Sequence, residues 1–282
     1  MELLSKAIPV AMLSFVVSSM LAVGLSLTVK QILDPLHSLK LVTLALLANF
    51  VLMPLVAFTL ARLLRLAPSL GVGLLLLSTA AGSPFLPKLT RIARNDLALA
   101  TGLMALLMGM TIGYMPVVLP MLLEGVSVDP VKIARSLVVL MLLPLAAGLL
   151  VKARYEATAA PVVPLLDRVS TLSLALMMAL IFVANFQSIL GLFGTRGILA
   201  SILFLLSGSA LGWFLGGQVA NAREVMTLGT AQRGIAAALV VADQDLNDPK
   251  VVAMVAVVAI FGSLFLFSLA RMLAIRGKNL EV

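Results

Sequence analysis

The chain has 282 residues, of which 62% are hydrophobic and only 11% are charged. Soluble domains carry roughly 45–50% apolar and about 25% charged residues, so this chain has too few polar side chains to cover a surface in water. The composition excludes a soluble enzyme and a disordered chain. It predicts an all-α polytopic membrane protein, with the lipid bilayer as its surroundings.

The net charge of +8 does not indicate a nucleic-acid partner. The basic residues are scattered between apolar runs, which is the pattern that the lysine and arginine excess of cytoplasmic loops produces. The chain has no cysteine and one histidine. Thiol chemistry is therefore excluded, and neither a clustered metal site nor any other cofactor is expected.

Apolar runs long enough to cross a bilayer core mark about nine helical spans, since a crossing needs roughly 20 residues. In chain order the predicted spans are 8–29, 41–61, 69–95, 97–122, 132–151, 169–190, 197–220, 225–242 and 250–272. Most charged residues fall in the connections between them, including the stretch 152–168. The distribution of lysine and arginine favours an N-terminus outside and a C-terminus in the cytoplasm, in the inner membrane if the protein is bacterial.

Two of these spans carry residues that interrupt a helix. The third contains Pro84 and Pro87, and the eighth contains Gly229 and Gly234 on either side of Arg233. Proline removes a backbone donor and clashes with the preceding turn, and unwound backbone is tolerated at membrane depth only inside protein or beside a cavity. The two spans lie five apart and so run in opposite directions. This pattern predicts one transporter domain, 1–282, made of inverted repeats at about 8–122 and about 132–272.

Four motifs in these regions resemble the bile acid:sodium symporter superfamily. Residues 93–99 read ARNDLAL, residues 229–239 read GTAQRGIAAAL, residues 49–54 read NFVLMP and residues 24–28 read GLSLT. The resemblance implies two inverted five-helix repeats, with two broken helices that cross between a panel domain and a core domain. Because the first span is similar to the second helix of the family, the chain is similar to a nine-span form.

The resemblance also shows where this sequence departs from the family's sodium ligands. Positions that carry side-chain oxygens in sodium symporters are mostly apolar here: Leu86, Pro87, Ala100, Met104, Thr227 and Ala231. A shift of one residue would place Gln232 at the last position, and Asn49 keeps an amide oxygen. Since Na⁺ needs several oxygens to replace its hydration water, the sequence predicts weak sodium binding.

Two fixed cations, Lys88 and Arg233, stand near the predicted crossing instead. A charged residue inside a span costs roughly 2.5–3.5 kcal/mol on insertion scales, so it normally faces a cavity or a partner. We expect these two side chains, with helix N-termini around Ser83 and Thr230, to attract an organic anion. Two alternatives remain open: Lys88 snorkels to the inner interface beside Arg91, or Arg233 caps carbonyls of the interrupted helix.

The predicted function is transport of a small or amphipathic organic anion by alternating access. The predicted binding residues are Asn49, Ser83, Pro87, Lys88, Thr227, Thr230, Gln232 and Arg233. A sodium-coupled symporter of bile-acid-like or other organic anions is the first alternative, and a non-transporting membrane sensor or scaffold is the second. No nucleophile–base pair appears in any span, so enzymatic activity is not expected. Asp96 is predicted to cap the helix that follows it.

Overall fold

The fold is all helical in a computed structural model that describes residues 2–28, 30, 38–123, 129–184, 195–217, 220–246 and 248–278. Seven helical stretches are long and apolar enough to cross a membrane. They are Ala7–Ser26, Leu39–Leu63, Leu97–Leu122, Pro130–Arg154, Pro161–Leu180, Gly197–Leu215 and Pro249–Arg276. Each falls on one of the predicted spans, which confirms the multi-pass architecture over the described residues.

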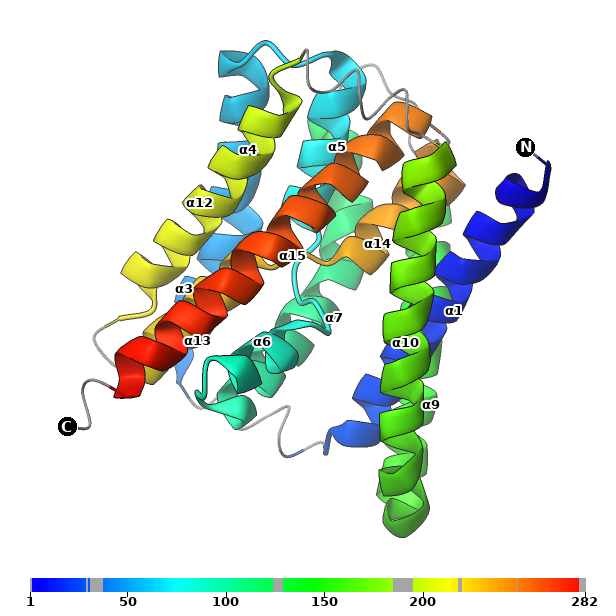
Figure 1. The fold of residues 1–282 in the computed structure, drawn as a ribbon, viewed down its shortest axis with the longest axis vertical. Coiled ribbons are helices and arrows are strands. Elements are labelled where there is room, and N and C mark those ends of the chain that lie inside the picture. Colours follow the sequence, from blue (N-terminus) through cyan, green and yellow to red (C-terminus); the bar gives the residue numbers. More distant parts are fainter. Residues whose placement is uncertain are drawn as a thin grey trace.

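Figure 1 shows the helices coloured in chain order, from α1 at the N-terminal end to α15 at the C-terminal end. Their bounds are α1 Glu2–Ser26, α3 Leu39–Leu47, α4 Met53–Leu63, α5 Pro68–Thr79, α6 Leu86–Ile92, α7 Leu97–Leu122, α8 Pro130–Leu137, α9 Leu143–Arg154, α10 Glu156–Ala184, α12 Gly197–Leu215, α13 Ala220–Ala231, α14 Ile235–Val240 and α15 Pro249–Lys278. Three π-helical turns lie between or after these helices: η2 Ala48–Leu52, η3 Val138–Leu142 and η4 Val241–Leu246. The predicted span 69–95 covers both α5 and α6, and the predicted span 225–242 covers most of α13 together with α14.

The helices form two groups, which Figure 1 shows side by side. We call α1, α9 and α10 the side group, because α1 packs along both of the others. We call the remaining helices from α3 to α7 and from α12 to α15 the main group; within it α12 packs on α13 and α15 packs on α5. A cavity lies between the two groups, lined by residues of both.

The sixth span begins earlier in the structure than the sequence predicted. The interval 152–168 was expected to be a polar connection, but α10 starts at Glu156 and runs through it to Ala184. The charges of Asp167 and Arg168 were misleading, because a helix can carry them where one side chain faces a cavity and the other stays exposed. Residues 185–190 of the predicted span lie outside the described residues.

The α12–α13 contact is built on a stripe of three glycines on α12. A Cβ at Gly208 would lie 3.0 Å from the Cα of Ala231, and one at Gly216 would lie 2.4 Å from the Cα of Arg223. At Gly212 it would lie 2.3 Å from the carbonyl oxygen of Met226. Spacing of four residues places the three glycines on one face of α12, so that the two backbones approach closely.

Gly212→Ala is expected to destabilise the protein because its methyl group meets backbone, which cannot rotate away. Overpacking of this kind costs about 1–3 kcal/mol, and we expect a fall of several degrees in the midpoint of thermal unfolding in detergent. Gly113→Ala is the matched control, because a Cβ there has nothing within 4 Å. Equal midpoints for the two variants would show that α12 and α13 are not packed as described.

Candidate functional site

The segment between α5 and α6, residues 80–85, is non-helical but its backbone polar groups are bound inside the protein. The Ala81 N–H donates to Thr111 Oγ1 at 2.9 Å, and the Thr111 hydroxyl donates to the Ala81 carbonyl at 3.0 Å. The Ala80 carbonyl accepts from the N–H of Gly234 at 2.9 Å. Backbone at this depth needs such partners, because no water or lipid group replaces them.

The segment between α13 and α14, residues 232–234, lies against the 80–85 segment. The Gly234–Ala80 hydrogen bond joins the two main chains, and Gln232 Nε2 donates to Ser83 Oγ at 3.1 Å. These contacts join residues about 150 positions apart near the middle of the main group, where Figure 1 shows α5, α6, α13 and α14 close together. Two of the predicted site residues, Ser83 and Gln232, therefore meet.

Arg233 lies at the centre of this junction and is 3% exposed. Its guanidinium donates to four backbone carbonyls and one side-chain oxygen. The acceptors are Leu77 O at 3.0 Å, Ser78 O at 2.6 Å, Thr230 O at 3.0 Å, Asn49 O at 3.4 Å and Asn49 Oδ1 at 2.7 Å. Every nitrogen of the guanidinium therefore has an oxygen partner from the protein.

These carbonyls are available because of where the helices end. The last four carbonyls of a helix have no intrahelical partner, and they carry the negative end of the helix dipole. Leu77 and Ser78 belong to the last turn of α5, and Thr230 belongs to the last turn of α13. One arginine thus compensates the C-terminal ends of two helices. Thr230 was expected beside a helix N-terminus, and this was wrong: it contributes a carbonyl, not a free N–H.

Pro54, in the first turn of α4, leaves two carbonyls of η2 without a helical donor. It has no N–H, so the carbonyls of Phe50 and Asn49, four and five residues earlier, lose their helical donor. The Tyr114 hydroxyl donates to the Phe50 carbonyl, and Arg233 donates to the Asn49 carbonyl. Asn49 is held from its other side, since Nδ2 donates to Ala45 O at 3.0 Å and to Thr230 Oγ1 at 3.4 Å. The amide is therefore fixed with its oxygen toward the guanidinium.

Arg233 does not reach a large open space. A hollow of about 10 Å³ borders Gln232 and Arg233, which is room for no more than one water molecule. Thr227, another predicted site residue, donates to the Arg223 carbonyl within its own helix at 2.7 Å. Asn49, Thr230, Gln232 and Arg233 form one enclosed cluster with Ser83, which we call the guanidinium cluster.

A cavity of about 450 Å³ lies between the side group and the main group. It is lined by α1, the 80–85 segment, α6, α7 and α10, and its polar or charged lining includes Ser19, Ser26, Lys88, Arg91, Thr101, Asp167 and Ser170. Pro87 and Lys88 are the predicted site residues among those lining it. The volume is within the usual range for small-molecule sites. Apart from Thr227, the predicted site residues therefore divide between the guanidinium cluster and this cavity.

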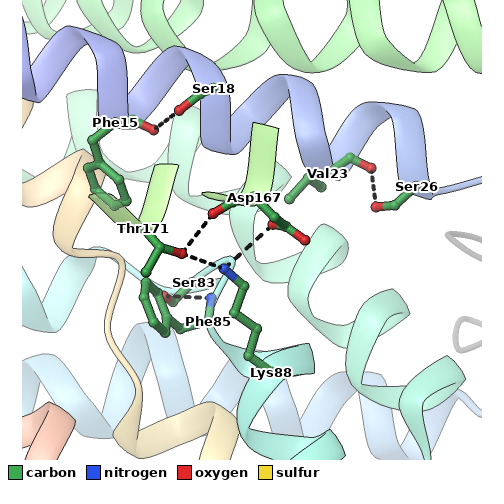
Figure 2. Close-up of polar contacts among 9 residues, drawn as sticks. All are labelled: Phe15, Ser18, Val23, Ser26, Ser83, Phe85, Lys88, Asp167 and Thr171. Atoms are coloured by element: carbon green, nitrogen blue, oxygen red, sulfur yellow. Dashed lines mark hydrogen bonds and ion pairs between the residues drawn. The ribbon is translucent and has the colours of Figure 1, made fainter. Parts of the chain in front are cut away.

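Lys88 spans the cavity from α6 to α10 (Figure 2). Its ammonium lies 3.5 Å from Asp167 Oδ1 and donates to Thr171 Oγ1 at 3.2 Å. It also lies 5.1 Å from the centre of the Phe85 ring. Thr171 is held in place by donating to the Asp167 carbonyl at 2.7 Å. The Lys88 side chain is 34% exposed, so it is not enclosed by protein as Arg233 is.

Three partners in these sites were missed from the sequence. Asp167 was assigned to a polar connection, while Thr111 and Tyr114 were read as ordinary members of an apolar span. Tyr114 stacks at 4.8 Å from Phe50 in addition to its hydrogen bond. The signal that could have singled out Thr111 and Tyr114 was the rarity of hydroxyl groups in the long helix α7. By contrast, Asp96 accepts from the Leu99 N–H at 2.9 Å, which confirms its predicted role as the cap of α7.

The long apolar helices define this chain as a multi-pass membrane protein. Residues 12–192 match the sodium bile acid symporter family, and the chain belongs to that family. This is a family of transport proteins, not of enzymes.

The chain is similar to several curated relatives at low identity. It is 26% identical over 236 residues to the probable sodium/metabolite cotransporter BASS1 of Arabidopsis thaliana, covering 82% of this chain and 58% of the relative. It is 27% identical over 203 residues to the uncharacterized sodium-dependent transporter YocS of Bacillus subtilis, covering 70% and 60%. The match to BASS5 of rice is 25% over 273 residues, covering 92% and 68%. The chain thus spans less than two thirds of the length of the first two relatives.

Proposed function

We propose that the protein is a secondary transporter that carries a small organic anion across the membrane by alternating access. The observation that supports this most is the cavity of about 450 Å³, which has one wall from the side group, another from the main group and a lysine ammonium inside. A ligand there would contact both groups at once, so that movement of one group against the other would change its access.

The proposal includes an inverted repeat, with one half at about 8–122 and the other at about 132–272. In this arrangement α5 and α6 correspond to α13 and α14, and each pair is one interrupted span. Supporting this, helices at corresponding places in the two halves pack together, α1 on α10 and α4 on α12. The orientation with the N-terminus outside and the C-terminus in the cytoplasm remains a prediction from the basic residues.

The proposed transport does not depend on sodium. In secondary transporters, half-helix C-terminal ends and unwound carbonyls coordinate the coupling cation. Here the C-terminal carbonyls of α5 and α13 point to the guanidinium of Arg233 instead. We propose that this tethered cation takes the place of a bound ion, because a second cation beside it would meet strong repulsion at low dielectric. The expectation that Arg233 itself contacts the substrate stays a prediction, and Lys88 is the better-placed group.

A sodium-coupled symporter is the second candidate, and it is favoured by the family and by the printed names of the relatives. Its ligands would be Asn49, Thr227, Thr230 and backbone carbonyls. A third candidate is a sensor or scaffold that binds the anion and does not move it. The three differ in whether counterflow occurs and whether it needs sodium, so one assay separates them.

The test is counterflow of labelled lactate, succinate, benzoate and cholate in proteoliposomes, in sodium chloride and in choline chloride. We expect at least one anion to accumulate well above empty liposomes and equally in the two salts. The same anion should raise the midpoint of thermal unfolding in detergent, since a ligand that binds only the folded state stabilises it. Accumulation that requires sodium would replace this proposal with the symporter, and binding without counterflow would replace it with the sensor.

A further inference from the structure

The Lys88–Asp167 ion pair joins a helix of the main group to a helix of the side group. Lys88 belongs to α6 in the main group, and both of its polar partners, Asp167 and Thr171, belong to α10 in the side group. Figure 2 shows the three side chains converging below α1, with the ammonium between the two oxygens. A contact between these residues can persist only while the two groups keep this relative position.

The pair also stands between two hollows. Lys88 and Asp167 line the 450 Å³ cavity, and both line a second, more open hollow of about 470 Å³ together with Arg168, Thr171 and Leu172. The carboxylate of Asp167 thus occupies the position from which a ligand in either hollow would approach the ammonium. Arg91, on the same helix as Lys88, adds a second positive charge to the lining of the cavity.

We infer that Asp167 is an internal competitor for the substrate, and that an organic carboxylate binds by taking its place on Lys88. This inference rests on the proposed function. A carboxylate is the right class because the oxygen now at 3.5 Å from the ammonium is itself a carboxylate oxygen. Entry of the substrate breaks the ion pair that joins α6 to α10 and frees the side group to move. The pair therefore holds the empty transporter in this state, and the substrate releases it.

If the substrate replaces Asp167 on Lys88, substitutions of Asp167 and of Lys88 have opposite effects on the affinity for the anion. Asp167→Asn removes the competing charge, so the anion no longer has to displace a carboxylate from Lys88 and its apparent affinity increases by about fivefold or more. Lys88→Gln abolishes binding. Lys40→Gln is the matched control, because Lys40 is exposed on α3 and does not line either hollow. Binding is measured by the thermal shift with lactate, succinate, benzoate and cholate as probes.

A second measurement follows the movement without any ligand. The chain contains no cysteine, so Thr101→Cys places a single thiol in the 450 Å³ cavity, and its rate of maleimide labelling in detergent reports how often this cavity is open. Asp167→Asn and Lys88→Gln each lower that rate several-fold, and the double exchange Lys88→Asp with Asp167→Lys restores it. A saturating anion lowers the rate in the otherwise unchanged protein.

The outcomes separate this inference from the proposed function. If an anion is transported but binds Asp167→Asn and the unchanged protein equally well, the proposed function stands and the competitor role is overturned. If no anion binds while substitutions of the ion pair still change the labelling rate, the proposed function is wrong. The replacement of Asp167 by a substrate is then wrong as well. Equal labelling rates in Asp167→Asn, Lys88→Gln and Lys40→Gln would show that the pair does not hold this state.

Discussion

Arg233→Ala is expected to lower the midpoint of thermal unfolding by about 10 °C or more and to abolish transport. The guanidinium donates five hydrogen bonds, four of them to backbone carbonyls. A buried group left without its partner costs about 1–3 kcal/mol, and losing one side of a buried charged contact costs about 3–5 kcal/mol. At roughly 2–4 °C per kcal/mol for a chain of this size, the fall is large. Arg271→Ala, on an exposed position of α15, is the control and should change little.

Chemical rescue distinguishes a tethered cation from simple loss of packing. The space left by Arg233→Ala keeps its carbonyl oxygens, so free guanidinium, far below denaturing concentrations, should raise the midpoint of this variant and not that of Arg271→Ala. Sodium should acquire a stabilising effect on Arg233→Ala for the same reason. Arg233→Lys should be intermediate, because an ammonium keeps the charge but cannot match the planar fork. A variant that stays as stable as the unchanged protein would disprove the role given to Arg233.

Gly82→Ala is expected to have the second largest effect on stability. It should prevent stable folding or lower the midpoint of thermal unfolding by an amount similar to that of Arg233→Ala. Gly82 has φ +75°, a conformation that costs other residues about 1–2 kcal/mol. A Cβ there would also lie 2.2 Å from the Met108 nitrogen and 2.7 Å from the Met104 carbonyl oxygen, both on the backbone of α7. Overpacking adds about 1–3 kcal/mol.

Gly109→Ala is the matched control for Gly82→Ala, because it adds the same methyl group on α7, one residue from Met108, where nothing lies within 4 Å. Thermal unfolding in detergent and the yield of monodisperse protein measure both variants. If the two variants behaved alike, the 80–85 segment could not lie against α7 as described. The Thr111–Ala81 hydrogen bonds, which hold the segment there, would then be in doubt as well.

Local features of the fold could be predicted because the signals that produce them are local. An apolar run of about 20 residues predicts a span whatever surrounds it, and seven such runs became the long helices. Asp96 predicted a cap because its partner, Leu99, is three residues away. The start of α10 was mispredicted, because charged residues within this helix were taken as a sign of a polar connection.

The sequence could predict which residues belong to the candidate site, but not how they are arranged. Polar residues are rare in spans, so Asn49, Gln232 and Arg233 stood out from the sequence, and all three lie in the guanidinium cluster. The sequence did not predict that Lys88 lies apart from these three residues, because no local pattern tells which polar residue faces an open cavity. Asp167 was missed for the same reason: its partner Lys88 is distant in the chain and belongs to the other helix group.

The sequence by itself determined that this is a multi-pass helical membrane protein, because the length of an apolar run decides whether a segment can cross a bilayer. It also placed two cations near interruptions of apolar runs, because proline and glycine interrupt a helix within a few residues of themselves. Tertiary structure alone decided what each cation does. Arg233 is enclosed because helices α5 and α13 end at the same place and direct unpaired carbonyls toward it. Lys88 is open because α6 and α10 leave a cavity between them. The same positive charge on a span is thus enclosed or left open according to the oxygens that the fold brings to it.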